Sequence, residues 1–226
     1  DEFNISAGTF TSKVSNDYCA DGFEIKASTD ASGNTTYGVV EAATAAAQIG
    51  ETTYETLQAA INAATAGQTV TLLADATEDV TINKNITLDL GGKTLTNTNA
   101  GKATVTIAKG ATATVQNGSV KGGTSYYNIQ NNGTATLEDV TATAGNIGSS
   151  MLDNWGTLTI TSGTYTGGLD TVKSEEGSVL TINGGKFISD YAPKYDITGV
   201  VMAYGTTTIN GGEFIQNSTT TGSRVI

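Results

Sequence analysis

A short motif that recurs about every 22 residues constrains the fold of this chain more than any other feature. Each copy begins with glycine, continues with alternating threonine and apolar residues, and turns near a second glycine or an aromatic residue. The five clearest copies are Gly110–Val120, Gly133–Ala142, Gly156–Tyr165, Gly177–Phe187 and Gly205–Phe214. Their central apolar residues are spaced 22, 23, 22 and 27 residues apart, and Leu88 lies 27 residues before the first: Val115, Leu137, Ile160, Ile182 and Ile209. Period-two alternation inside a repeat of this length predicts short strands that stack coil upon coil.

We therefore predict an all-β fold, a right-handed parallel β-helix with coils of about 22 residues, each coil made of three short strands and three turns. A leucine-rich repeat has a similar length, but its spaced leucines and asparagine are missing. A helical repeat needs longer units and helix-forming residues, which these segments lack.

Stacked coils should place equivalent residues in columns. One column is glycine in four coils, with Val140 as the exception: Gly118, Gly163, Gly185 and Gly212. Two residues later each coil carries an apolar or aromatic residue: Val120, Ala142, Tyr165, Phe187 and Phe214. Further strands are expected between the repeats, at Tyr126–Gln130, Met151–Leu152, Thr171–Val172 and Val200–Met202. A column of like residues lets each coil bury its apolar face against its neighbours.

The first quarter of the chain has a different pattern. Residues 53–66 predict one amphipathic helix, with Thr52 and Glu55 as a capping box and Gly67 as its end, placed to cover the open first coil. Two strand-like runs, Gly22–Ile25 and Thr35–Val39, flank a turn-rich segment and predict a hairpin.

Residues 4–10 repeat the pattern of residues 159–165 position for position, which is typical of the last half-coil of a preceding unit. We accordingly divide the chain into residues 1–46, the end of a preceding repeat unit with a hairpin connector, and residues 47–226, the capping helix and the β-helix.

The charge of the chain excludes several classes of partner. The net charge is −11 and the isoelectric point is about 4.2, so that phosphate backbones and anionic membrane surfaces are repelled. No apolar run is long enough to insert into a membrane. Cys19 is the one cysteine, so no intrachain disulfide can form. We expect no nucleic-acid partner, no membrane insertion and a monomeric chain.

Three segments, at residues 47–64, 67–73 and 84–95, resemble the β-helix repeat modules of large secreted surface proteins of Gram-positive gut bacteria. Those β-helices are similar to the pectate-lyase-like superfold. The resemblance implies an extracellular location, with attachment to the cell surface through parts of the protein outside this sequence. It implies little about activity, because one fold supports many functions.

The residues required for the common β-helix chemistries are missing. The chain has no histidine, and its single arginine, Arg224, lies two residues from the end of the sequence. This excludes histidine bases and histidine-ligated metals, and it leaves pectate-lyase-like catalysis without a suitably placed base. A carboxylate pair could still hydrolyse a glycoside, with Asp153, Asp170, Glu175 and Glu176 as candidates, but no neighbour in the sequence suggests a raised pKa. We predict that the chain is not an enzyme.

Acidic oxygens leave a structural calcium ion open as an alternative, and no other cofactor is expected. The candidate ligands are Asp153, Asp170, Glu175 and Glu176, with Asp190 and Asp196 in or beside the insert at residues 188–198.

The residue before each repeat glycine forms the column of greatest functional interest: Asn132, Trp155, Glu176 and Tyr204. Asn131 and Asn154, one position earlier, are expected to turn inward as an asparagine ladder, so that Trp155 and Tyr204 would point outward. An exposed tryptophan is a candidate platform for a sugar ring or a protein partner. The alternative is an aromatic residue packed under a loop, such as residues 188–198.

The leading hypothesis is a non-catalytic surface module, an adhesin that binds a host or microbial glycan or protein. The alternatives are a passive spacer that holds another domain away from the cell, a polysaccharide lyase or hydrolase, and a phage-tail adhesin. A uniformly threonine- and asparagine-coated surface would favour the spacer, whereas aromatic residues on an open face favour the adhesin.

Overall fold

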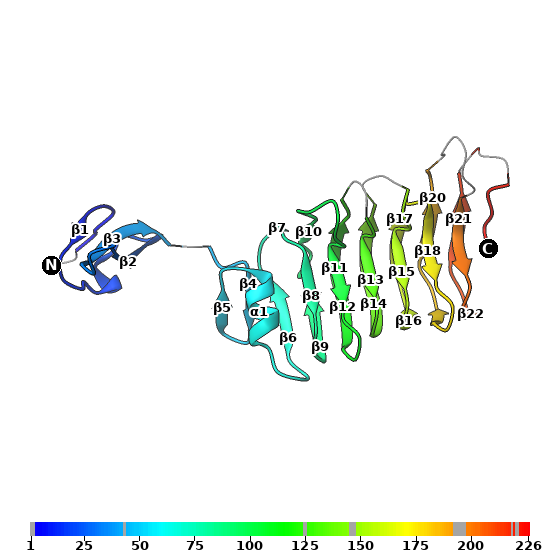
Figure 1. The fold of residues 1–226 in the computed structure, drawn as a ribbon, viewed down its shortest axis with the longest axis horizontal. Coiled ribbons are helices and arrows are strands. Elements are labelled where there is room, and N and C mark those ends of the chain that lie inside the picture. Colours follow the sequence, from blue (N-terminus) through cyan, green and yellow to red (C-terminus); the bar gives the residue numbers. More distant parts are fainter. Residues whose placement is uncertain are drawn as a thin grey trace. The chain divides into compact units, whose positions relative to one another are not determined.

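The computed structural model describes residues 3–42, 44–123, 126–144, 148–191, 198–217, 219 and 222–226. The chain forms two compact units, Asp1–Thr44 and Ala45–Ile226. We refer to them as unit 1 and unit 2, and Figure 1 shows the elements of each.

Unit 1 is a three-stranded antiparallel sheet in the order β1-β3-β2, with a 3-10 turn, η1. Its elements are β1 (Thr9–Phe10), η1 (Asn16–Tyr18), β2 (Phe23–Thr29) and β3 (Thr35–Glu41). Strands β2 and β3 pair over their full length, which confirms the predicted hairpin. The Asp30 carboxylate fixes the turn because it accepts hydrogen bonds from the backbone amides of Ser32 and Asn34, both at 2.9 Å. None of the described residues of unit 1 is buried.

Unit 2 begins with an antiparallel pair of strands, β4 (Ala47–Ile49) and β5 (Thr52–Tyr54), followed by the helix α1 (Leu57–Ala63). The predicted helix start was therefore wrong, because Thr52 belongs to a strand and the N-cap is Thr56, whose side chain accepts from the amide of Ala59 at 3.1 Å. The helix also ends before Gly67, at the C-cap Ala64.

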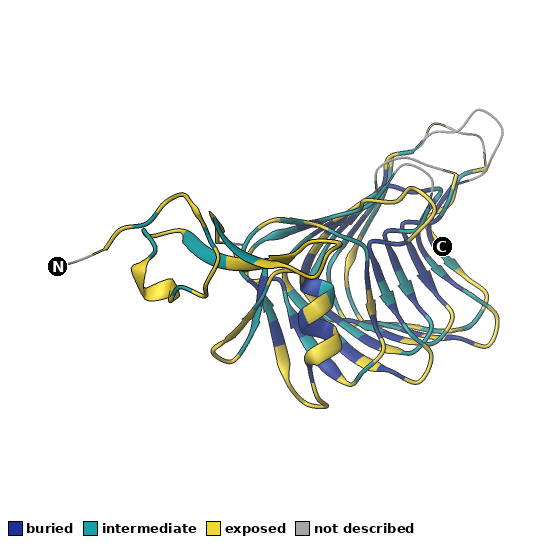
Figure 2. Cartoon of the chain, turned by 60° about the vertical axis from the view of Figure 1, so that its left-hand side comes forward, coloured by how far each residue is buried: buried dark blue, intermediate teal, exposed yellow. Residues whose placement is uncertain are grey.

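Two side chains from the first coil complete the ends of α1. The Glu78 carboxylate accepts from the amides of Leu57 (2.8 Å) and Gln58 (3.1 Å), which are two of the amides that a helix N-terminus leaves unpaired. The Lys84 ammonium donates to the Ala64 carbonyl at 2.7 Å. Each charge also has the favourable sign for the helix dipole. Figure 2 shows one side of α1 buried and the other exposed, as expected of a helix that covers the first coil.

Beyond α1 the chain winds into a parallel β-helix of about six turns with a spacing of about 23 residues, which confirms the predicted fold class. Three ladders of strands run along it. The first ladder holds the central apolar residues of the repeats and consists of β6 (Thr69–Leu72), β9 (Ile86–Asp89), β12 (Thr112–Lys121), β14 (Thr134–Thr143), β16 (Thr157–Ile160), β19 (Val179–Ile182) and β22 (Thr206–Ile209).

The second ladder continues the long strands β12 and β14 around a bend and holds the aromatic column. Its other members are β7 (Ala76–Thr77), β10 (Thr94–Thr96), β17 (Gly163–Thr166), β20 (Lys186–Ser189) and β23 (Glu213–Gln216). The third ladder is a separate six-stranded parallel sheet of β8 (Val80–Ile82), β11 (Val105–Ile107), β13 (Ile129–Asn131), β15 (Leu152–Asn154), β18 (Asp170–Ser174) and β21 (Gly199–Ala203). Figure 1 shows these six strands side by side along unit 2.

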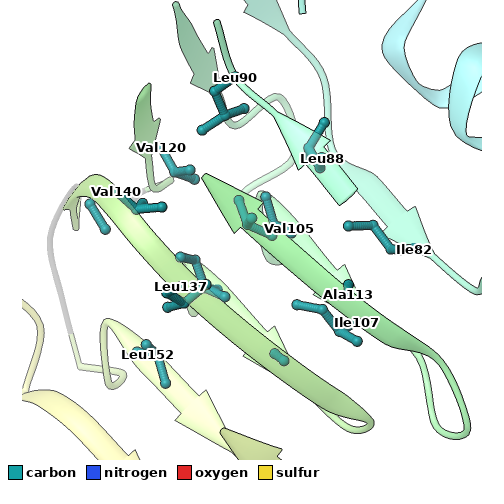
Figure 3. Packing of buried hydrophobic residues seen from close by; sticks show 14 of the residues in the cluster. Ile82, Leu88, Leu90, Val105, Ile107, Ala113, Val120, Leu137, Val140 and Leu152 are labelled. Atoms are coloured by element: carbon teal, nitrogen blue, oxygen red, sulfur yellow. The ribbon is translucent and has the colours of Figure 1, made fainter. Parts of the chain in front are cut away.

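The coils stack in the register that the repeat predicts. Leu88, Val115, Leu137, Ile160, Ile182 and Ile209 are paired successively along the first ladder. All of them except Ile209 in the last coil have 0% of their surface exposed. Figure 3 shows how side chains from the three ladders, among them Leu88, Ile107 and Leu152, meet in the interior. The interior of the β-helix is thus a continuous apolar core.

The aromatic column forms a ring stack inside the second ladder. Tyr165 and Phe187 have ring centroids 5.1 Å apart and planes inclined by 10°, and Phe187 and Phe214 repeat this geometry at 5.1 Å and 9°. The glycine two residues before each ring has a positive φ, +111° at Gly163, and a Cβ there would lie 2.3 Å from the Val140 carbonyl oxygen. The glycine column therefore arises from both conformation and close approach.

The exception at Val140 has a local cause. In that coil the left-handed residue is the preceding one, Asp139, at φ 50°, and the coil before it likewise uses Asn117 at φ 57°. Gly118 is required for a different reason, because a Cβ on it would lie 2.4 Å from the Cβ of Leu90. Among the described residues, no helix is long and apolar enough to cross a membrane.

Candidate functional site

The candidate site lies on the outer face of the six-stranded sheet. One inward position of each of these strands is apolar, as in the paired residues Ile129, Leu152 and Val172. Strand alternation then directs the next residue of each strand outward. These outward residues form a column in the order Thr106, Gln130, Asp153, Lys173 and Met202. The column is polar in its middle, with opposite charges on adjacent strands.

A second column borders the first where each strand ends. The backbone amides of Asn132, Trp155, Glu175 and Tyr204 each donate to the carbonyl of the preceding coil, at 2.7–2.8 Å. The predicted position of Glu176 in this column was therefore wrong, because Glu175 lies between Trp155 and Tyr204. The reason is the length of the corner: two residues separate Asn154 from Thr157, whereas four separate the paired residues Ser174 and Val179.

The predicted asparagine ladder is present inside the corner. The Asn131 amide nitrogen donates to the Asn154 side-chain oxygen at 2.8 Å, and Asn154 donates to the Ser174 hydroxyl at 3.1 Å. Both asparagines are fully buried, and each also accepts from the amide of the glycine two residues later. The next residue of each coil must then face outward. Trp155 is 53% exposed and Tyr204 is 60% exposed, so neither ring is packed under the described part of the insert at residues 188–198.

Trp155 is held in place by Asp153. The indole Nε1–H donates to Asp153 Oδ2 at 2.7 Å, and the Gln130 side-chain amide donates to the same oxygen at 3.3 Å. Asp153 itself is fully buried beneath this cover, and its Oδ1 has no hydrogen-bond partner. Burial raises the pKa of the Asp153 carboxyl, against the two hydrogen bonds that lower it. The tryptophan ring is therefore both exposed and fixed in orientation.

Lys173 and Glu175 form the second half of the face. The Lys173 ammonium lies 2.5 Å from Glu175 Oε1, and 5.8 Å from the centroid of the Tyr204 ring. The hydrogen bond to Glu175 raises the pKa of Lys173, which keeps it charged. Together with Glu176, these three residues line a shallow open cavity of about 420 Å³.

Two tyrosines extend the face toward the earlier coils. Tyr126 and Tyr127 have ring centroids 4.7 Å apart, and Tyr126 and Gln130 line a second cavity of about 200 Å³ with Asp79 and Lys102. Burial and the nearby Asp153 raise the pKa of Tyr127. The sequence-based site did not include Tyr126, Tyr127, Gln130 or Lys173. The strand predicted at Tyr126–Gln130 begins only at Ile129, so both tyrosines precede it. Strand register could have placed Gln130 and Lys173 on one face, because both are paired with Asp153.

The calcium candidates do not converge. Asp170 is buried, where its carboxylate accepts from the Ser150 hydroxyl at 3.3 Å and from the Gly199 amide at 3.1 Å. Glu175 is paired with Lys173. Asp196 lies outside the described residues. Among the residues that are described, no three acidic side chains gather where they could share a metal ion.

Two of the candidate catalytic carboxyls, those of Asp153 and Asp170, are buried. We expected nothing to raise the pKa of the candidate carboxyls, but burial does so for both Asp153 and Asp170. A raised pKa is what a general acid needs. In both residues, however, the carboxyl is closed off: at most 5% of either residue is exposed to solvent.

Comparison of the chain with protein-family models, with curated proteins and with solved structures finds no match.

Proposed function

We propose that this chain is a non-catalytic binding module of an extracellular surface protein, and that the outer face of the six-stranded sheet binds a glycan. The observation that carries the proposal is Trp155, an indole ring that is 53% exposed and yet fixed by a 2.7 Å hydrogen bond to a buried carboxylate. Holding a large exposed side chain in one orientation costs conformational entropy. A fixed aromatic surface loses little conformational entropy when a sugar ring stacks on it.

The spacing of the aromatic rings fits an extended saccharide. Trp155 and Tyr204 occupy one column with a single coil between them. Adjacent parallel strands lie about 4.8 Å apart, so the two positions are about 10 Å apart. That distance suits sugar rings in successive or alternate positions along a chain. Between the rings, Lys173 and Glu175 offer a donor and an acceptor for sugar hydroxyls.

The charges of the face favour a neutral or amine-bearing glycan over a polyuronate. Glu175 and Glu176 stand at the rim of the larger cavity, and Lys173 is already neutralised by its 2.5 Å pairing with Glu175. The chain as a whole carries a net charge of −11. A glycan that bears a carboxylate on every sugar would be repelled by the two glutamates and by the net negative charge of the chain.

The proposal includes an extracellular location with attachment to the cell surface, and a relation to the repeat modules of Gram-positive surface proteins. The resemblance of residues 47–95 to those modules supports both parts. A passive spacer is the second candidate. The uniform stacking of the coils favours it, because stacked coils can separate two domains by a fixed distance without binding a ligand.

A glycan array probed with the labelled chain and two variants tests the proposal. We expect the wild-type chain to retain a defined set of neutral or amino-sugar glycans and Trp155→Ala to lose them. Tyr18→Ala is the matched control, because Tyr18 is an aromatic residue 47% exposed in unit 1 and should not matter. Equal retention by Trp155→Ala and the wild type would refute the site. Retention of no glycan by the wild type would favour the spacer.

A further inference from the structure

A second cavity on the outer face of the six-stranded sheet, of about 200 Å³, has a polar floor. Thr81, Thr106 and Gln130 line this floor, and they are paired neighbours on β8, β11 and β13. Thr81 and Thr106 each lie between two buried apolar residues of the same strand, so both side chains point outward. The floor therefore presents two hydroxyls and one amide at the spacing of adjacent strands, about 4.8 Å.

One wall of the cavity is a loop that Asp79 holds in place. The Asp79 carboxylate accepts four hydrogen bonds from residues 97–99, two on each oxygen, at 2.7–3.0 Å. The Asn97 side-chain amide also donates to the Lys102 carbonyl at 3.0 Å. The loop thus has a fixed shape, and Lys102, an exposed residue that lines the cavity, adds a charged hydrogen-bond donor to it.

Tyr126 lines the same cavity with an aromatic ring. The centroid of this ring lies 4.7 Å from that of Tyr127, and the contact limits the orientations that Tyr126 adopts. A sugar ring has an apolar face and a rim of hydroxyls. A cavity that combines an aromatic ring with hydroxyl, amide and ammonium groups therefore has the features of a sugar subsite.

Gln130 joins this cavity to the Trp155 site. It lines the cavity, and its side-chain amide donates at 3.3 Å to Asp153 Oδ2, the same oxygen that accepts from the Trp155 indole at 2.7 Å. Asp153 is in turn paired with Lys173, which lines the larger cavity of about 420 Å³. The two cavities and Trp155 therefore lie along one column of outward residues on five adjacent strands, β8, β11, β13, β15 and β18, which Figure 1 shows side by side.

This face disfavours a peptide or protein ligand. Between β8 and β18 each strand is hydrogen-bonded to its neighbours. A side chain of α1 covers the outer edge of β8, since Gln58 accepts from the Thr81 amide at 2.7 Å and donates to the Thr81 carbonyl at 3.2 Å. An extended peptide therefore finds no free backbone edge to pair with here. Asp153 and Lys173 at the centre also differ from the core of a protein interface, which is depleted of charge. A ligand rich in hydroxyls matches this face.

We propose that the two cavities are subsites of one continuous track, and that its ligand is an unbranched oligosaccharide whose chain runs across the strands. One sugar stacks on Trp155, and another lies against Tyr126 with its hydroxyls bound by Lys102 and Thr106. The distance between strands, about 4.8 Å, is close to the length that one sugar adds to an extended chain, so the five strands accommodate about five sugars. This inference rests on the proposed function and adds the length and the direction of the glycan.

Calorimetry with oligosaccharides of increasing length tests the track. The wild-type chain is titrated with cello-oligosaccharides, which are neutral, and with glucosamine oligosaccharides, which bear amines, from two to eight sugars long. In the series that binds, affinity should rise several-fold from two sugars to about five and then level off, with one hexasaccharide bound per chain. Equal affinity for two and for six sugars, or two hexasaccharides per chain, would overturn the track. Failure of both series to bind at every length would overturn it as well.

Two variants and a control locate the second subsite. Lys102→Ala and Tyr126→Ala should each weaken hexasaccharide binding several-fold, and the loss should be smaller for the disaccharide. Lys26→Ala is the matched control for the lost charge, because Lys26 is an exposed lysine of unit 1 and should leave both affinities unchanged. Hexasaccharide binding that depends on Trp155 but not on Lys102 or Tyr126 would refute the second subsite and leave the proposed function standing. Binding that does not depend on Trp155 would refute the proposed function itself.

Discussion

Replacement of Ile160 tests the inward column with a magnitude that follows from the structure. Ile160 is 0% exposed and pairs with Leu137 on one side and Ile182 on the other. Truncation to alanine removes three carbons that contribute about 0.8 kcal/mol each, or about 2.4 kcal/mol, and the residual cavity adds to this. Rigid coils above and below cannot collapse into the space. We therefore expect Ile160→Ala to lower the free energy of unfolding by about 3–4 kcal/mol.

Ile160→Asp should be worse, because it places an unpaired charge in the same apolar space. The matched control is Thr159→Asp, one residue earlier, which faces outward and should cost under about 0.5 kcal/mol. Urea unfolding followed by far-ultraviolet circular dichroism measures all three, with the slope of the transition checked for constancy. Equal losses at positions 159 and 160 would refute the assignment of the inward and outward faces.

Three further predictions concern the N-terminus of α1, the glycine bends of the coils and the Asp153 carboxyl beneath Trp155. Glu78→Ala should cost about 1–2 kcal/mol and fray α1, measured by amide hydrogen exchange at Leu57, because the first-turn amides lose their acceptor. Gly163→Ala should lower the melting temperature far more than Gly148→Ala, because a Cβ at Gly163 meets the Val140 carbonyl at 2.3 Å whereas one at Gly148 meets nothing within 4 Å. Asp153→Asn should leave the fold intact and raise stability relative to the wild type at neutral pH. Burial raises the folded-state pKa of Asp153, so its contribution to stability is fully present below the unfolded pKa of about 3.9 and is lost as pH rises through the folded value. The urea midpoints of the wild type and Asp153→Asn are compared across the pH range. A difference between them that is the same at every pH would contradict this prediction.

Like-on-like stacking explains why so much of the fold could be predicted from sequence. A residue of a β-helix meets its own equivalent one coil away, so the repeat that reveals Ile160 and Ile182 also reveals that they touch. The same argument placed Asn131 above Asn154, and the outward direction of Trp155 follows from that ladder. The long-range contacts of this fold are thus encoded by a local pattern.

The errors arose where the contact had no equivalent in the repeat. The carboxylate that caps α1 comes from Glu78, 21 residues beyond the first helical amide, and a local capping-box pattern could not identify it. Glu175 replaced Glu176 because that corner is two residues longer than its neighbours. The buried state of Asp153 depends on its cover by the Trp155 indole, which a periodic pattern does not express.

The most direct test of the proposed binding face uses its own fluorophore. Trp155 is the only tryptophan of the chain, so the intrinsic tryptophan emission reports on this one position. The wild-type chain is titrated with a glycan retained on the array, and affinity is measured in parallel by calorimetry for the wild type and for Tyr204→Ala. We expect the emission to shift to the blue on binding, as the exposed indole is covered, and Tyr204→Ala to bind several-fold more weakly, since stacking on an aromatic ring contributes about 1 kcal/mol. Calorimetric binding with no change in Trp155 emission would show that the ligand binds elsewhere and would contradict the proposed site.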